Sequence, residues 1–135
     1  MRLVIHRQSD SIKIFTEDSW RDRASIFPQL IDEIKKNIKV DFVVDTEFVE
    51  WQDNKPIPRE SMMWVIQTKT PMSDDVELHV NVHDCIFYDE EAINILPYHE
   101  RLEFLDKLLP KDLKYLKKAK SCIATDRKSF DKCLK

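Results

Sequence analysis

The run from Val40 to Trp51 (VDFVVDTEFVEW) constrains the fold more than any other part of the sequence. It is rich in β-branched and aromatic residues, which favour a strand. Side chains alternate between the two faces of a strand, so one face is almost wholly apolar and the other carries Asp45 and Glu47. Carboxylates on such a strand are costly unless they meet solvent or a partner. The run therefore predicts either a solvated sheet face or a site where Asp45 and Glu47 meet a metal, a ribose or a base.

The absence of glycine from all 135 residues limits the motifs that the chain can contain. P-loops and dinucleotide fingerprints need glycine where the backbone approaches phosphate, so any nucleotide contact must come from side chains on regular elements. The net charge of −3 argues against a strongly basic nucleic-acid module but leaves room for a local basic patch. The 42% hydrophobic content and the length predict a single domain over residues 1–135.

Targeting signals are absent from the sequence. No apolar run approaches the roughly 20 residues of a membrane span, and no signal peptide opens the chain. We therefore expect no membrane association, a cytoplasmic (intracellular) location and a monomer.

The apolar periodicity predicts an α+β fold, in which an antiparallel β-sheet is packed by helices. Strands are expected over residues 2–7, 11–15, 40–51 and 76–88, with a helix opening at Phe27-Pro28 and further helices over 58–67, 97–109 and 127–134. Residues 111–118 are expected to add one or two helical turns, and 121–124 a short strand. Asp126 is expected to cap the last helix.

The strand expected over residues 76–88 gives little sign of metal or thiol chemistry. Strict alternation places His79, His83 and Cys85 on one face, but two histidines four residues apart on a strand lie about 13 Å apart and cannot bind one metal ion. Nothing marks a thiolate environment around Cys85, so a buried structural cysteine is expected. The lysine-rich segment 107–120 is interpreted as a solvated amphipathic face, with nucleic-acid contact as the alternative.

Five stretches, taken in order, carry a resemblance to a known family: RLVIH at 2–6, KIFTEDSWRDRASIFP at 13–28, VVDTEFVEW at 43–51, VNVHDCIFYDEEAINILPYHERLEFLDKLL at 80–109 and ATDRKSFDKCLK at 124–135. Together they resemble the adenylation (nucleotidyltransferase) domain of ATP-dependent DNA ligases. The resemblance implies an ATP-grasp-like nucleotidyltransferase fold with ATP and Mg²⁺ as cofactors. It also implies a parent enzyme that seals nicks in double-stranded DNA, in replication, repair or recombination, through a lysyl-AMP intermediate.

The resemblance also assigns nucleotide-binding roles to three residues. Arg2 matches an arginine just beyond the family's nucleophile motif and would orient phosphate or ribose. Glu47 matches the glutamate of the Asp-x-Glu motif, which contacts the ribose and assists metal binding. His83, immediately before Asp84, matches an aromatic residue that stacks on adenine. Asp45 is expected to be structural.

Two motifs of the family are missing from these residues. Neither the Lys-x-Asp-Gly motif with the nucleophilic lysine nor the downstream Glu-Gly-x-x-x-Lys motif is present. The resemblance therefore implies an internal fragment with no catalytic residue of its own, which would not self-adenylate, and both ends look cut from a longer chain. Two local departures stand out: Thr16-Glu17 replaces a frequent Ser-Arg, and Asp89-Glu90 replaces the usual Asp-Gly turn.

Two alternative functions stay open from the sequence. Asp-Thr-Glu-Phe on a strand also resembles the first metal-binding motif of DEDD-type 3′–5′ exonucleases, in which Asp45 and Glu47 would hold two metal ions. That chemistry needs further aspartates on a helix, and the sequence has no Tyr-x-x-x-Asp element. A non-catalytic nucleotide-binding module is the second alternative.

Overall fold

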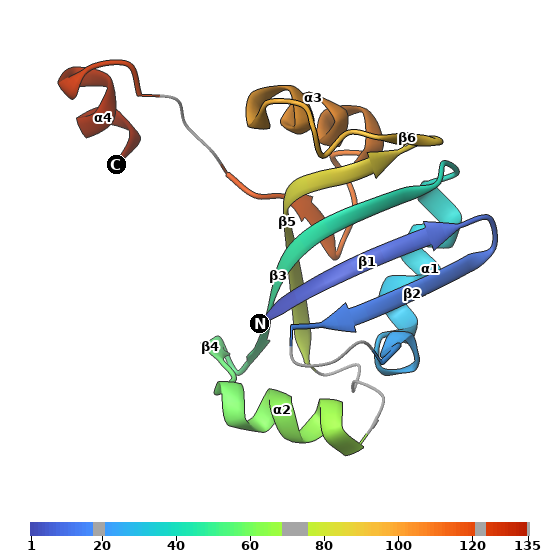
Figure 1. The fold of residues 1–135 in the computed structure, drawn as a ribbon. Helices are drawn as coiled ribbons and strands as arrows, with labels where there is room; N and C mark the ends of the chain where they lie inside the picture. Colours follow the sequence, from blue (N-terminus) through green and yellow to red (C-terminus); the bar gives the residue numbers. More distant parts are fainter. Residues whose placement is uncertain (18–20, 69–75, 121–123, 135) are drawn as a thin grey trace.

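The computed structural model describes residues 1–17, 21–68, 76–120 and 124–134, which form one curled sheet with flanking helices (Figure 1). Within these residues, no helix is long and apolar enough to cross a membrane. The strands are β1 (Arg2–Gln8), β2 (Ser11–Thr16), β3 (Phe42–Gln52), β4 (Lys55–Pro56), β5 (Glu77–Tyr88), β6 (Glu91–Ala92) and β7 (Leu116–Lys118). The helices are η1 (Ala24–Ile26, 3₁₀), α1 (Pro28–Asn37), α2 (Arg59–Thr68), α3 (Tyr98–Leu108) and α4 (Arg127–Cys133).

The described strands pair in the order β2-β1-β3-β5-β6, with β4 beside β3 and β7 beside β5. These pairings are antiparallel except that between β5 and β7, which is parallel. The predicted α+β class is therefore confirmed, with one parallel pair that the sequence did not predict. The order places β1, β3 and β5 side by side, so residues far apart in the sequence meet on the same face of the sheet.

The face of the sheet toward α1 carries the hydrophobic core, and we call it the inner face (Figure 1). Pro28 begins α1, as expected for a residue whose missing N–H needs no partner in the first turn. The ring of Phe48 on β3 meets Phe27, which precedes α1, edge-on with centroids 5.5 Å apart. The opposite face is the outer face, and its polar residues on the three central strands include Arg2, His6, Asp45, Glu47, His79, Asn81 and His83.

The alternation predicted for β3 is confirmed. Phe42, Val44, Thr46 and Phe48 are at most 1% exposed, whereas the residues between them are half-buried or exposed. The inner face also takes in Glu50, a carboxyl that is only 4% exposed. Among the described residues its Oε1 finds no hydrogen-bond partner, and burial raises the pKa of Glu50.

The strict alternation predicted for β5 is wrong beyond Val82. Thr46 of β3 pairs with Val82, but Asp45 pairs with Asp84, so His83 is an extra residue in a β-bulge. The ladder shifts again past Cys85, which lies on the inner face instead of the face of His79. Cys85 is fully buried, as expected. Burial raises the pKa of the Cys85 thiol to about 11, as suits a structural cysteine.

The helical turns predicted over residues 111–118 are also wrong. The segment runs on from α3 to form β7, because its backbone finds partners far away in the sequence. The Glu33 carboxylate on α1 accepts hydrogen bonds from the backbone N–H groups of Lys114, Tyr115 and Leu116, at 2.8, 3.0 and 2.9 Å. Leu116–Lys118 then pairs with β5.

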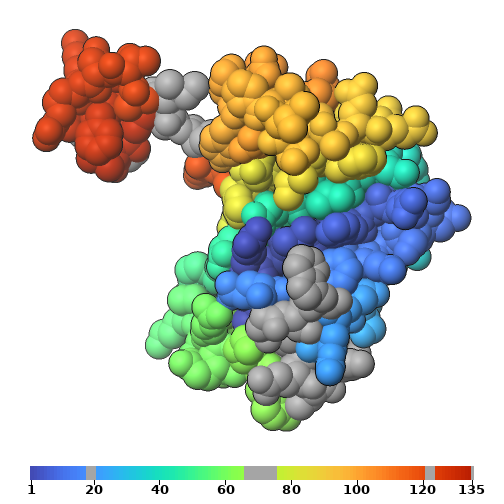
Figure 2. Space-filling model, viewed as in Figure 1, coloured from blue at the N-terminus to red at the C-terminus, as the bar shows by residue number. Residues whose placement is uncertain are grey.

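Helix α4 stands apart from the sheet in Figures 1 and 2, and none of its residues is buried. The predicted cap is confirmed, since the Asp126 carboxylate accepts a hydrogen bond of 2.7 Å from the backbone N–H of Ser129. That bond lowers the pKa of Asp126. Of the short strand predicted over 121–124, residues 121–123 lie outside the described residues.

The hairpin turns use residues other than glycine in left-handed conformations. Ser9, Asp53, Asn54, Asp89 and Glu90 have φ angles of 54°, 54°, 61°, 44° and 73°. Asparagine and aspartate tolerate this region better than serine or glutamate. Residues other than glycine thus adopt the left-handed conformations that glycine often adopts in such turns.

Candidate functional site

The outer face brings Arg2, Glu47 and His83 together around Asp45. Arg2 on β1 lies opposite Glu47 on β3 in the sheet register. The Arg2 Nε donates a hydrogen bond of 2.8 Å to Oδ1 of Asp45, and the His83 Nε2 lies 3.8 Å from the same oxygen. Three residues singled out separately in the sequence therefore lie on three adjacent strands.

These four side chains differ in their exposure to solvent. The side chains of Arg2, Glu47 and His83 are 51%, 53% and 40% exposed, whereas that of Asp45 is 14% exposed. The hydrogen bond to Asp45 raises the pKa of Arg2 and fixes the direction of its guanidinium. Asp45 thus orients Arg2, while the side chains of Arg2, Glu47 and His83 remain accessible from solvent.

Glu47 is the more exposed of the two carboxylates on the outer face of β3. It accepts an ion-paired hydrogen bond from the amino group of Met1, which also donates to the Phe48 carbonyl at 2.9 Å. Within the part of the chain that the structure describes, no group of three or more His, Cys, Asp or Glu could hold a metal ion. One carboxylate alone fits Mg²⁺ that is bound chiefly through water and substrate phosphates.

Helix α3 supports the bulge that carries His83. The Tyr98 hydroxyl donates to the His83 carbonyl at 2.8 Å, and the Arg101 Nε donates to Oδ1 of Asp84 at 2.8 Å. Arg101 also donates to the Leu96 carbonyl at 2.6 Å. Sequence reasoning did not give Tyr98 or Arg101 a role, although the Pro-x-x-x-Arg-Leu pattern that begins at residue 97 was the available signal.

The other histidine of β5 has separate partners. The His79 Nε2 lies 2.9 Å from Oε1 of Glu77, and its ring meets Trp51 with centroids 6.2 Å apart. His83 instead faces Asp45. The two imidazoles therefore belong to different environments along the strand.

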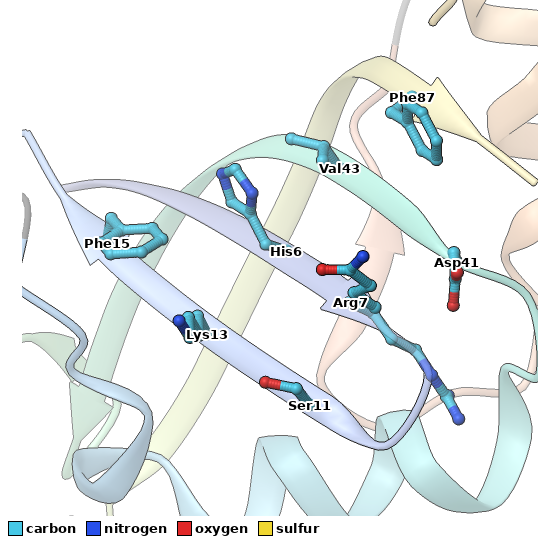
Figure 3. Close-up of a pocket in the computed structure, with 9 residues that line it drawn as sticks. His6, Arg7, Ser11, Lys13, Phe15, Asp41, Val43 and Phe87 are labelled. Atoms are coloured by element: carbon cyan, nitrogen blue, oxygen red, sulfur yellow. The ribbon is translucent and has the colours of Figure 1, made fainter. Parts of the chain in front are cut away.

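A cavity of about 560 Å³ continues the outer face beyond Asp45, and sequence reasoning did not predict it. Figure 3 shows its lining side chains, which come from β1, β2, β3 and β5 and include His6, Lys13, Phe15 and Phe87. The ring of His6 meets Phe15 edge-on at 5.2 Å. Burial, and then the charge of Lys13, lower the pKa of His6, which favours the neutral imidazole.

The curled sheet, its helices and this outer face define a known structural class. The fold matches mycobacterial DNA ligase D complexed with ATP and MES, with a TM-score of 0.67 at 19% identity, over 98% of this chain and 41% of that one. It also matches the ligase domain of M. tuberculosis LigD, with a TM-score of 0.64 at 18% identity, over 98% and 40%. The fold is therefore the one seen in these two ligase structures.

The sequence comparison identifies the family. Residues 1–135 match the family described as "ATP dependent DNA ligase domain". The chain therefore belongs to this family. Curated relatives include the DNA ligase of Archaeoglobus fulgidus, 26% identical over 98% of this chain, and that of Methanosphaera stadtmanae, 26% identical over 81%. The chain spans 25% and 20% of these two relatives.

The comparisons confirm the resemblance seen in the sequence, and they identify the chain as a fragment of an ATP-dependent ligase adenylation domain. They offer no support for the exonuclease alternative. In the structure, the Asp45 carboxylate also contacts Arg2 and His83. The two carboxylates of β3 therefore have different surroundings, whereas an exonuclease would need both for metal ions.

Proposed function

We propose that this chain is one part of the adenylation domain of a DNA ligase that uses ATP to seal nicks in double-stranded DNA. The family match over all 135 residues carries the proposal. The gathering of Arg2, Glu47 and His83 on one face supports it. We further propose that residues 1–135 are a single partial domain. The nucleophilic lysine and the downstream lysine motif then lie outside it, because the sequence holds neither motif.

The exposed groups have complementary roles toward one nucleotide. Arg2, directed by Asp45, binds a phosphate or ribose oxygen through charge-assisted hydrogen bonds. Glu47 binds a ribose hydroxyl or serves as a ligand of Mg²⁺. When bound, Mg²⁺ would neutralise charge on the phosphates. His83 stacks its ring on adenine, with its backbone held by Tyr98.

The test transplants the chain into a complete ligase. The matching segment of the Archaeoglobus fulgidus enzyme, which aligns with 98% of this chain, is replaced by residues 1–135. The chimera is incubated with α-³²P-ATP and Mg²⁺, and then with a nicked duplex. We expect covalent AMP labelling and sealing by the chimera. We expect a loss of about 100-fold in labelling rate for its Glu47→Gln variant, on the scale of removing one polar group at a reaction centre.

The matched control is Glu60→Gln, which makes the same change at an exposed position on α2. It should leave labelling unchanged. A folded chimera without label would contradict the proposal and favour a non-catalytic nucleotide-binding module. Full labelling by the Glu47→Gln variant would remove the role given to Glu47. Label on the isolated chain would overturn the placing of the nucleophile outside these residues.

The proposal also extends to the location and the oligomeric state of the protein. A DNA substrate supports an intracellular location for the parent protein. A monomer is proposed for the chain, because a nucleotide site on one sheet face needs no second subunit. Light scattering coupled to size exclusion should then return a mass near 16.2 kDa.

A further inference from the structure

Residues 107–120 carry a large excess of positive charge. They hold six lysines and one aspartate in a chain whose net charge is −3. We call these lysines the lysine surface; its members are Lys107, Lys111, Lys114, Lys117, Lys118 and Lys120. The sequence left two interpretations open, a solvated face and a nucleic-acid contact.

The contacts of these lysines show which of them already have a partner. In the part of the chain that the structure describes, Lys118 alone of the six pairs with a carboxylate, at 2.9 Å from Asp106. Lys107 and Lys114 lie over the rings of Phe104 and Tyr115, at 4.8 and 5.3 Å. Among the described residues, the other five lysines therefore have no carboxylate partner at ion-pair distance, so their charges are available to an external anion.

Three of the lysines converge on one hollow. Lys111, Lys117 and Lys118 line a cavity of about 560 Å³ between α3 and β7, together with Leu105 and Leu109. Lysines on an edge strand can serve to discourage strand addition. Protection of the sheet edge can explain Lys117 and Lys118 on β7. It does not explain the lysines at positions 107, 111 and 114, which precede the strand.

The sheet register connects the lysine surface to the nucleotide site. Arg2 lies opposite Glu47, Glu47 opposite Asn81, and Asn81 opposite Lys117. The four residues form one row across β1, β3, β5 and β7. Lys117 is therefore two strands from Glu47, about 10 Å along the row. That distance is about three base pairs of axial rise in a DNA duplex.

We propose that the lysine surface binds the phosphate backbone of the DNA duplex that flanks the nick. The choice of DNA as the polyanion rests on the proposed function. Lysine suits this contact, because its flexible stem and point charge engage phosphates without reading sequence. One end of the row, at Arg2, then contacts the nucleotide, and the other end, at Lys117, contacts the duplex.

The test measures how strongly salt weakens binding of the 135-residue chain to a fluorescent nicked duplex, by anisotropy between 50 and 200 mM salt. The test variant is Lys111→Gln/Lys114→Gln/Lys117→Gln. Each phosphate contact adds about 0.9 to the slope of log affinity against log salt, so three lost contacts reduce the slope by roughly 2.7. Over this fourfold range, the unmodified chain should lose roughly 40-fold more affinity than the variant does.

The matched control removes the same charge from the end of α1, outside residues 107–120. Lys35→Gln/Lys36→Gln/Lys39→Gln alters three exposed lysines at the end of α1, and it should keep the slope of the unmodified chain. Thermal unfolding confirms that both variants are folded. Equal slopes in the two variants, or no duplex binding by the unmodified chain at 50 mM salt, would overturn the proposal. AMP labelling of the chimera needs no duplex. The labelling experiment therefore tests the proposed function, the salt dependence tests the lysine surface, and either can fail without the other.

Discussion

The inner and outer faces of the sheet separate stability from binding within the same strands. On β3, Val44 and Phe48 are at most 1% exposed on the inner face, whereas the Glu47 side chain is 53% exposed on the outer face. A side-chain period of two makes this division possible, because each strand contributes to both faces at once. The comparison teaches that a shift of one residue in β3 would exchange the core for the candidate site.

Removing an inner-face ring should have the largest effect. We expect Phe48→Ala to lower the free energy of unfolding by about 3–5 kcal/mol, because the fully buried ring leaves a cavity beside Phe27. The outer-face neighbour Val49→Ala should lower it by less than about 1 kcal/mol. Urea denaturation measures both. Similar losses of unfolding free energy in the two variants would contradict the assignment of stability to the inner face.

Glu50 is the exception on the inner face, and its variant should stabilise the protein. Burial raises the pKa of Glu50 above its usual 4.5, so the folded state favours the neutral carboxyl. The stability that this group contributes is fully present below pH 4.5 and is lost as the pH rises through the raised pKa. Glu50→Gln should therefore raise the free energy of unfolding by about 1–2 kcal/mol at pH 8, the scale of a buried unpaired polar group, and the gain should shrink toward pH 4.5.

The control for that experiment is Glu60→Gln, at an exposed position. It should show no such change in stability between the two pH values. Chemical denaturation at both pH values gives the comparison. A Glu50→Gln variant that is less stable at pH 8 than the unmodified chain would show that the charged carboxylate is satisfied in solution.

The smallest stability change is expected on the outer face, at Asp45. Asp45→Asn should alter the free energy of unfolding by less than about 1 kcal/mol, because its partner Arg2 is half exposed and screened by solvent. In the chimera, however, it should raise the KM for ATP, since Arg2 loses its anchor. Asp10→Asn, in the exposed turn after β1, is the matched control. An unchanged KM would leave Asp45 with no positioning role.

Prediction from the sequence worked best where a strand is regular and its own residue pattern is enough to show which face is buried. The alternation of β3 predicted which face would be buried, from Phe42 to Phe48, because the pattern itself carries that information. The resemblance also singled out Arg2, Glu47 and His83 before their positions were known. Their meeting around Asp45 could not be derived from the pattern, because it depends on β1 and β5 both pairing with β3.

The errors arose where distant partners decide local structure. A bulge at His83 reverses the expected direction of Cys85, and no periodicity in the strand marks an extra residue. Residues 111–118 have a pattern compatible with a helix, but Glu33 and β5 supply hydrogen bonds that favour an extended backbone. The burial of Glu50 likewise depends on surrounding elements that the pattern of β3 does not reveal.

The turns without glycine have a consequence for the unfolded chain. Each left-handed residue other than glycine costs the folded state about 1–2 kcal/mol, and five described residues adopt this conformation. Glycine would relieve that strain, but it would also widen the range of backbone conformations open to the denatured chain. A chain with no glycine at all therefore begins folding from a narrower ensemble, and its hairpins lose less conformational entropy as they close.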